Sequence, residues 1–380
     1  MKMLKIMSAG PTQVRENVRQ ARSRICTNPD LDPAFFQSYE ETCKKISSIL
    51  HTNNDTHILS GEGILGLEAA IASLTEPNDR ALVIENGIFG EGFADFIQMY
   101  QGDVTFFHGD KLKGIDLDEL KAFLDKDHDF AYATLVHVDT PSGVCNDITA
   151  ICTLLHSYGI LSVVDSVAGM IGEEVNVDEA HIDILCGGSQ KAISVPPGLT
   201  IVTISDDAWR KMEQRKTPIA GFYVNLLNFK NVLKEQWFPY TMPVSDIEGL
   251  RVAIDNILDE PAIVNRHERI AKATREAVTK AGLTLYLNDN HANTVTVINV
   301  PEGVSSPQLL QDMIDDHHIL ISGCFSYLQD KVIRIGHMGE NANVEDVALT
   351  LSALQACFTK QGYHLSCDME DVFLSSVRQG

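Results

Sequence analysis

Between residues 58 and 204, short segments rich in Val, Ile and Leu alternate with segments whose apolar residues recur at helical spacing. This alternation predicts strands joined by helices, and therefore a mainly parallel sheet covered by helices on both faces. We accordingly expect an α/β fold with a doubly wound sheet. The expected strands are residues 81–84, 104–107, 132–138, 161–165, 182–185 and 199–204, and the expected helices between them include residues 117–124 and 148–158.

The length of 380 residues predicts a large domain and a smaller one, because single cores seldom grow that large. The turn from Ser8 to Thr12 is incompatible with a packed helix, so residues 1–20 are expected to form an N-terminal arm. We place the large domain at residues 21–258 and a smaller α+β domain at residues 259–380. Supporting segments are a linker-like stretch at 236–243, a helical region at 245–280, strands at 294–300 and 332–335, and helices at 307–316 and 344–359.

The net charge of −22 argues against nucleic acid or an anionic membrane as a partner, because such partners are held by clustered Lys and Arg. The N-terminus lacks the apolar run of a signal peptide, and no segment approaches the roughly 20 apolar residues of a membrane span. We therefore expect a cytoplasmic protein. The eight cysteines include no CxxC pair, so we expect reduced thiols and no metal site.

Two polar residues follow expected strands at the edge where parallel sheets bind ligands. Asp165 ends one strand, and Lys191 follows another strand after the glycine pair at 187–188, which allows a tight turn. Pyridoxal chemistry needs such a pair: a lysine for the Schiff base and a carboxylate that keeps the pyridine nitrogen protonated. Taken alone, Lys191 is more simply explained as a solvated surface lysine; the pairing with Asp165 favours the pyridoxal site.

Two glycine-rich turns add to this pattern. Residues 60–66 form a turn that leads into a helix, whose first free backbone N–H groups make an anion site, although an ordinary helix cap explains the segment equally well. Three glycines surround Phe89 and would let its ring lie over a flat ligand; the alternative is an ordinary core phenylalanine. Asp139–Gly143 makes a further polar turn at the same sheet edge.

The chain resembles the class V aminotransferases of fold type I, the alanine–glyoxylate and serine–pyruvate group. The resemblance runs nearly from end to end, through the segments SAGPT, GLEAAIASL, NGIFG, DTPSG, VVDS, GSQK with PPG behind it, FPYTMPVS and VIRIGHMG. It implies Lys191 as the Schiff-base lysine, Asp165 as the partner of the ring nitrogen, and Phe89 as the ring stacked on the cofactor. It also implies that Thr140 bonds the 3-oxygen side and that Val167 packs beneath the ring.

The resemblance further implies a carboxylate clamp and a shared active site. Arg334 would hold the substrate carboxylate as a rigid bidentate fork, with the backbone near Gly10 assisting. A homodimer is implied, with possible pairing into tetramers, and Phe238 and Thr241 would line the partner's site. The turn residues Gly61, Glu62 and Gly63, together with Gln190, would meet the far end of the cofactor.

Two departures from the family pattern concern the phosphate of the cofactor. Glu62 stands where most members offer a small hydroxyl residue, and Phe238 stands where a tyrosine usually reaches the phosphate. A phosphate carries about −1.5 to −2 charges, and two unit charges roughly 4 Å apart repel by about 4 kcal/mol at an effective dielectric of about 20. Glu62 therefore disfavours a phosphorylated cofactor, unless it is only a first-turn glutamate favoured by the helix dipole.

The same two residues occur in the pyridoxamine–pyruvate branch of the family, which handles unphosphorylated vitamin B6 and shares DTPSG, RIGHMG and an extension like residues 362–377. We therefore predict transamination between pyridoxamine and a small 2-oxo acid, pyruvate, giving pyridoxal and L-alanine, with Glu62 accepting a hydrogen bond from the 5′-hydroxyl. Three departures oppose this: Cys324 replaces an Arg, Phe89 replaces a Tyr, and Ser189 with Gln190 keeps the ordinary family form.

Two other functions stay open at this stage. One is a conventional alanine– or serine–glyoxylate aminotransferase that retains pyridoxal 5′-phosphate, with Glu62 turned outward. The other is a non-catalytic B6-binding protein, which the presence of Lys191, Asp165 and Arg334 opposes.

Overall fold

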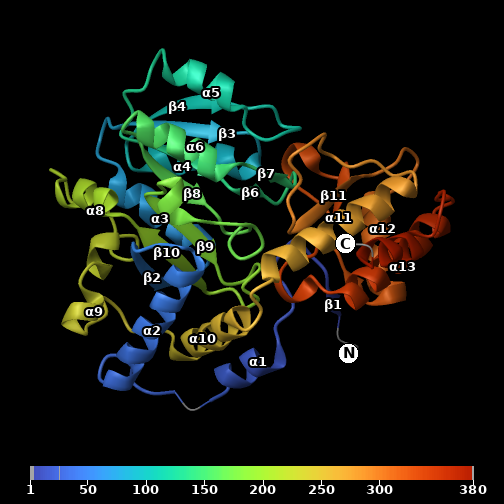
Figure 1. Cartoon of the computed structure of the whole chain (residues 1–380), viewed down its shortest axis with the longest axis horizontal. Coiled ribbons are helices and arrows are strands. Elements are labelled where there is room, and N and C mark those ends of the chain that lie inside the picture. The colour runs from blue at the N-terminus through green and yellow to red at the C-terminus, as the bar shows by residue number, and fades with distance from the viewer. Residues whose placement is uncertain (1–3, 25, 379–380) are drawn as a thin grey trace.

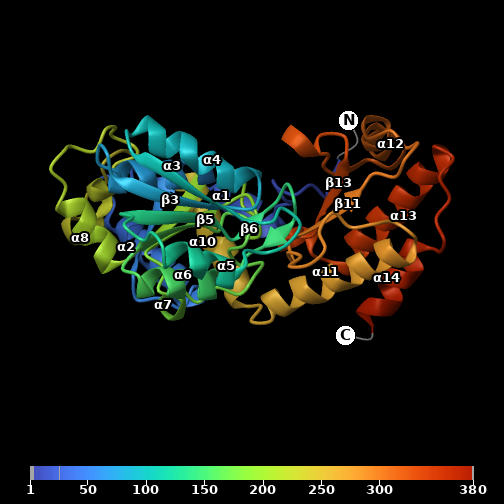
Figure 2. The same ribbon diagram turned by 90° about the horizontal axis from the view of Figure 1, so that it is seen from above.

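The computed structural model describes residues 4–24 and 26–378, which form a large and a small domain side by side (Figures 1 and 2). The large domain is built on a seven-stranded sheet of order β2-β10-β9-β8-β5-β3-β4, in which β10 is antiparallel to both neighbours and every other pair is parallel. Its strands are β2 (Asp55–Ser60), β3 (Arg80–Glu85), β4 (Asp103–His108), β5 (Tyr132–Val136), β8 (Leu161–Asp165), β9 (Ile184–Gly188) and β10 (Leu199–Ile204).

Helices cover both faces of this sheet, as the alternating sequence pattern predicts. In Figure 2, α3 and α4 lie on one face, and α6 and α7 lie on the other. β5, β9 and β10 are buried along their whole length, which explains their almost continuous apolar sequences. The helices are α1 (Glu16–Arg22), α2 (Pro33–Ile49), α3 (Gly63–Leu74), α4 (Ile88–Met99), α5 (Leu117–Leu124), α6 (Ile148–Ser157), α7 (Val177–Ala180), α8 (Asp206–Glu213), α9 (Val232–Glu235) and α10 (Val244–Leu258).

The small domain pairs β11 with β13 and adds four helices. Its elements are α11 (Ile263–Lys280), β11 (Val295–Asn299), α12 (Ser306–His317), β12 (Ile319–Leu320), β13 (Val332–Gly336), α13 (Val344–Lys360) and α14 (Met369–Val377). The helical region expected at 245–280 is divided into α10 and α11 near Pro261, because proline lacks an N–H donor and restricts the residue before it.

The N-terminal arm joins the two domains. Its strand β1 (Lys5–Ile6) pairs in parallel with β12 of the small domain, whereas α1 packs against α10 of the large domain. Between these contacts the arm crosses the sheet edge, where the Thr12 N–H donates to the Gln190 carbonyl at 3.1 Å. The arm therefore passes directly over the turn that carries Lys191.

The strand registers bring the predicted site residues to one edge. Asp165 pairs with Val136 of β5 and Cys186 of β9, so these three parallel strands end together. β2 runs in the same direction as β9 because both are antiparallel to β10, and Ser60 lies opposite Leu199 at the same edge. The turns that follow β2, β5, β8 and β9 consequently surround one space, as expected for ligand sites of open α/β sheets. Two additional short strands, β6 (Val138–Asp139) and β7 (Val144–Cys145), form a hairpin there.

Candidate active site

A cavity of about 500 Å³ opens at this edge of the sheet and brings together most of the predicted site residues. Its walls are mainly apolar, with a few polar groups at the base, which is typical of sites for small organic ligands. The predicted residues that line it are Gly10, Glu62, Phe89, Thr140, Asp165, Val167, Gln190 and Lys191.

Lys191 follows β9 and is held by the N-terminal arm. Its Nζ donates to the Ala9 carbonyl at 2.7 Å. Gly10 has φ +90°, and a Cβ at that position would lie 2.4 Å from Lys191 Cδ, so only glycine allows this approach. Burial lowers the pKa of Lys191 to about 8, with the Arg334 charge acting in the same direction, while Asp165 and Glu62 oppose the shift. A lysine in this state supplies a neutral amine near neutral pH.

Asp165 ends β8 and is buried in the base of the cavity. Its Oδ1 accepts the Val167 N–H at 2.9 Å. Burial raises the pKa of Asp165 to about 7; the Val167 N–H and Lys191 act against this rise, and Asp139 and Glu62 add to it. A buried carboxylate is stabilised by a proton or a cationic partner, and a pyridinium N–H would be such a partner.

The apolar walls come from Val167 and Phe89. The Phe89 ring, from the first turn of α4, is 37% exposed and lies 6.1 Å from the Phe325 ring of the small domain. An aromatic ring with a free face is available for stacking on a flat ligand. Thr140 is buried beside them, in the turn that follows β6.

Arg334 of β13 reaches the cavity region from the small domain. Its Nε donates to the Gly323 carbonyl at 2.8 Å, and its Nη1 donates to the Thr140 carbonyl at 3.0 Å. These bonds fix the guanidinium plane and leave its other N–H groups for a ligand carboxylate. Cys324 lies nearby with its Sγ 3.7 Å from the Pro141 carbonyl, and burial raises the pKa of its thiol, so Cys324 adds no positive charge.

Glu62 occupies the anion position at the start of α3. It is the N-cap residue, and its Oε2 accepts the Ile64 N–H at 3.1 Å. Its Oε1 accepts a hydrogen bond from Gln190 Nε2, which turns the carboxylate toward the cavity. The two interpretations of Glu62 therefore coexist: it caps the helix and it also faces the ligand space.

The two glycines beside Glu62 serve close packing. The Gly61 N–H donates to the Gly198 carbonyl at 2.8 Å, and a Cβ on Gly63 would lie 2.8 Å from Val167 Cγ2. Gln190 presents a buried Oε1 that has no hydrogen-bond partner among the described residues. A ligand hydroxyl would satisfy this oxygen, whereas a phosphate, which offers acceptors only, would not.

Phe238 is buried against aromatic side chains of its own chain. Its ring is 3% exposed and stacks on Phe36 at 4.5 Å between ring centroids, with Phe35 and Tyr39 at its edges. Aromatic packing within its own chain therefore surrounds this ring, and the expectation that Phe238 lines the partner's site stays a prediction. Thr241 is exposed and its hydroxyl donates to Asp30 at 3.1 Å, outside the residues that line the cavity.

The residues present fit the ring of a B6 vitamer better than its phosphate. Lys191, Asp165, Phe89 and Val167 supply an amine, a buried carboxylate and apolar walls within one cavity. At the other end, the Ile64 N–H at the start of α3 already donates to the carboxylate of Glu62. The site therefore fits a pyridoxal ring, and its helix N-terminus does not fit a second anion.

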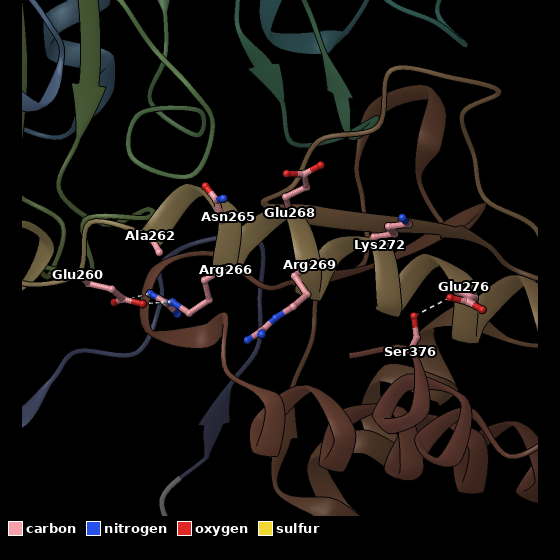
Figure 3. A pocket seen from close by; sticks show the side chains of 9 residues that line it. All are labelled: Glu260, Ala262, Asn265, Arg266, Glu268, Arg269, Lys272, Glu276 and Ser376. Atoms are coloured by element: carbon pink, nitrogen blue, oxygen red, sulfur yellow. Dashed lines mark hydrogen bonds and ion pairs between the residues drawn. The ribbon is translucent and has the colours of Figure 1, made fainter. Parts of the chain in front are cut away.

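A larger hollow of about 690 Å³ lies along the exposed face of α11 in the small domain (Figure 3). Its side chains pair with one another: Arg266 with Glu260 at 2.6 Å, and the Ser376 hydroxyl with Glu276 at 2.6 Å. Mixed charges of this kind are typical of a solvated helix face, so the smaller apolar cavity is the candidate active site. Among the described residues, no group of three or more His, Cys, Asp or Glu side chains has the arrangement of a metal site.

Sequence comparison identifies the family. The model of the family described as aminotransferase class-V matches residues 7–348. A pyridoxamine–pyruvate transaminase from Mesorhizobium japonicum is 32% identical over 95% of this chain and 93% of its own length. The chain belongs to the class V aminotransferases and is an aminotransferase, which confirms the resemblance seen in the sequence.

Solved structures of aminotransferases have the same fold as this chain. Ureidoglycine–glyoxylate aminotransferase from Bacillus subtilis superposes with a TM-score of 0.96 at 25% identity, over 100% of this chain and 99% of that one. Pyridoxamine–pyruvate aminotransferase from Mesorhizobium loti superposes with a TM-score of 0.95 at 30% identity, over 100% and 98%. The expected fold type I architecture is confirmed. Within the described residues, every helix is too short or too polar to cross a membrane.

Some groups at the site were not found from the sequence. The Ala9 carbonyl that holds Lys191 is a backbone group, and no residue type signals it. Asp139 is different, because it ends a short strand at the same edge as Asp165 and is 1% exposed. The rule that identified Asp165 also applies to Asp139.

Proposed function

We propose that this aminotransferase transfers an amino group between pyridoxamine and a small 2-oxo acid, pyruvate, giving pyridoxal and L-alanine, with the unphosphorylated vitamin as substrate. The observation that carries this proposal is the position of Glu62 at the N-terminus of α3, where its carboxylate accepts from Ile64 and Gln190. A phosphate in the same place would repel it by about 4 kcal/mol per unit charge at roughly 4 Å. A neutral 5′-hydroxyl would instead donate to Glu62.

When bound, the pyridoxal ring supplies an electron sink for the reacting carbon. Lys191 is the group placed to react with the aldehyde and to move the proton, because its pKa of about 8 keeps part of the amine neutral at physiological pH. The buried Asp165 carboxylate would accept a hydrogen bond from the ring N–H and so keep the proton on the ring nitrogen. Arg334, already fixed by two backbone carbonyls, orients the acid through its remaining N–H groups.

The acceptor is expected to be a small monocarboxylic acid. Arg334 is close enough to the cavity for its charge to lower the pKa of Lys191, and Cys324, which neighbours Arg334, has no positive charge to offer a second carboxylate. Phe89 lines the cavity and its ring lies 6.1 Å from the Phe325 ring, so an apolar surround is available for a methyl-sized side chain. Pyruvate meets both conditions, and it also agrees with the name of the 32% identical relative.

The second candidate is a conventional enzyme that retains pyridoxal 5′-phosphate and uses alanine or serine with glyoxylate. The structural similarity to a glyoxylate aminotransferase supports it. It requires Glu62 to leave the α3 N-terminus or to become protonated.

We also propose a homodimer. Phe222, Tyr223 and Trp237 are more than half exposed, at 57%, 53% and 55%, and Tyr223 stacks on Tyr240 at 4.3 Å. Exposed aromatic groups of this size are typical of protein interfaces. Light scattering of the purified protein, compared with W237E, tests this: a dimer that dissociates in W237E is expected, and a monomeric wild type contradicts the proposal.

The functional proposal is tested by vitamer competition. The purified protein is incubated with equal pyridoxal and pyridoxal phosphate and then denatured, and the released vitamer is identified by mass. We expect pyridoxal, and we expect pyridoxamine and pyruvate to be consumed in proportion to the alanine formed. Stoichiometric release of pyridoxal phosphate, with many turnovers of an amino acid per cofactor, would establish the second candidate instead.

A further inference from the structure

Asp139 lies at the end of β6, between two turns that carry site residues, and its carboxylate is 1% exposed. Oδ1 accepts the Phe89 N–H at 3.0 Å. Oδ2 accepts the Ser142 N–H at 3.1 Å and the Ser142 hydroxyl at 2.6 Å. One buried carboxylate thus receives donors from two separate loops.

The first loop is the start of α4, which presents Phe89. The N-cap residue of α4 is Gly87, which has no side chain to cap the helix, whereas α3, α5 and α6 use their own acidic N-cap side chains. Asp139 replaces the missing cap from outside the helix. A Cβ on Gly87 would lie 2.4 Å from Asp139 Cγ, so the glycine is what allows this contact.

The second loop is the turn that carries Thr140. The Asp139 carbonyl accepts the Gly143 N–H at 2.7 Å, and its side chain holds Ser142, so both ends of the turn depend on this residue. Thr140, enclosed between them, offers its carbonyl to Arg334 at 3.0 Å. A displacement of the turn would therefore displace the guanidinium that faces the substrate carboxylate.

We propose that Asp139 is a positioning residue that holds both Phe89 and the Thr140–Arg334 pair, and so supports, through two separate branches, the binding of the vitamin ring and of the 2-oxo acid that the proposed function assigns to this site. Burial raises the pKa of Asp139, and the donors from Ser142 and Phe89 oppose the rise. A buried acid kept in place by that many donors is suited to holding loops rather than to contacting substrate.

The test is a double-mutant cycle between D139N and F89A, read by absorbance titration with pyridoxal and with pyridoxal phosphate. Asparagine keeps the size of the side chain but has one acceptor instead of two, so either Phe89 or Ser142 loses its partner. We expect D139N to weaken vitamer binding about tenfold and to have little further effect once Phe89 is alanine. The visible circular dichroism of the bound vitamer should fall in both single variants and no further in the double variant.

The second arm measures the KM of pyruvate. D139N should raise it about tenfold in both backgrounds, because the Thr140–Arg334 branch does not pass through Phe89. Additive effects of D139N and F89A on vitamer binding, or an unchanged KM for pyruvate, would overturn the proposal.

S142A serves as the second variant in case D139N does not fold. It removes the 2.6 Å contact to the Asp139 carboxylate, together with the longer contacts of the same hydroxyl to the Asp139 carbonyl at 3.3 Å and from the Val144 N–H at 3.4 Å. Parallel increases of about threefold in both constants support the proposal, and a change in only one of them contradicts it. The vitamer arm reads binding alone and includes both vitamers. A preference for the phosphorylated form would therefore refute the proposed function while leaving the Asp139 cycle interpretable.

Discussion

The two ends of the cavity differ in which groups for binding pyridoxal phosphate they contain: one has the groups for the ring, and the other lacks a free site for the phosphate. At the ring end, Lys191 and Asp165 have pKa values moved by burial to about 8 and about 7, and both face one apolar space. At the α3 end, the Ile64 N–H already donates to the carboxylate of Glu62, which occupies the anion position. Under the proposed function, catalysis and vitamer choice reside in separate elements, and substitutions should affect one without the other.

The largest effect is expected at the ring end, from K191A. Removing the amine removes both the nucleophile and the proton carrier, and we expect a loss of at least about a thousandfold in transamination. The measurement is the steady-state rate with pyridoxamine and pyruvate. K272A, an exposed lysine of α11, is the matched control. Undiminished turnover in K191A would contradict both proposed transaminase functions, because each of them uses Lys191.

D165N should follow, with vitamer binding about a hundredfold weaker at pH 8. In the wild type, pyridoxal binding needs a neutral Lys191 and an ionised Asp165. It should therefore weaken as the pH falls through about 8, and more steeply below about 7. In D165N the lower step disappears, and the Lys191 step moves to lower pH, because Asp165 raises the pKa of that lysine. Stopped-flow absorbance between about pH 6 and about pH 9 measures both steps. An unchanged two-step profile in D165N contradicts the assignment.

G10A should have a smaller effect of about tenfold on the same reaction. The new methyl group would lie 2.4 Å from Lys191 Cδ, and φ +90° disfavours any side chain. G303A separates these two causes, because Gly303 has φ +85° but open space around it. If G303A and G10A slow turnover equally, crowding of the lysine is not the reason.

The smallest effect is expected from F238Y, at the position where the family resemblance implies a contact with the cofactor phosphate. Because the ring packs on Phe36 and Tyr39, an added hydroxyl would be buried without a partner, which costs about 1–3 kcal/mol of folding stability. We expect a Tm lower by a few °C, and no change in vitamer preference. F222Y, on an exposed ring, is the control. A gain in pyridoxal phosphate affinity in F238Y would show that this segment reaches a neighbouring site after all.

The sequence predicts the architecture well because its signals are local. Continuous apolar strands such as β9, and a helix break near Pro261, follow from period and backbone chemistry alone. Lys191 and Asp165 were predicted for the same reason, since each ends a strand at a shared edge.

The remaining features depend on contacts distant in sequence. The Phe238 ring packs with Phe35 and Phe36, about 200 residues earlier in the chain, and nothing in its own segment indicates that. The N-terminal arm holds Lys191 through the backbone carbonyl of Ala9, which no residue type in the sequence indicates. Whether Glu62 caps its helix or faces the cavity was undecidable from the sequence, and the structure shows that one carboxylate does both.

The most direct test compares the dissociation constants of pyridoxal and pyridoxal phosphate for the wild type, E62Q and E62S. Glutamine retains an oxygen for the Ile64 N–H, removes the charge, and places an amide donor where Oε1 of Glu62 accepts from Gln190 Nε2. The account predicts that the wild type prefers pyridoxal by about a thousandfold per unit of charge, that E62Q largely abolishes this preference, and that E62S reverses it. A wild type that binds pyridoxal phosphate more tightly, with a ratio unchanged in E62Q, would show that Glu62 does not choose the vitamer.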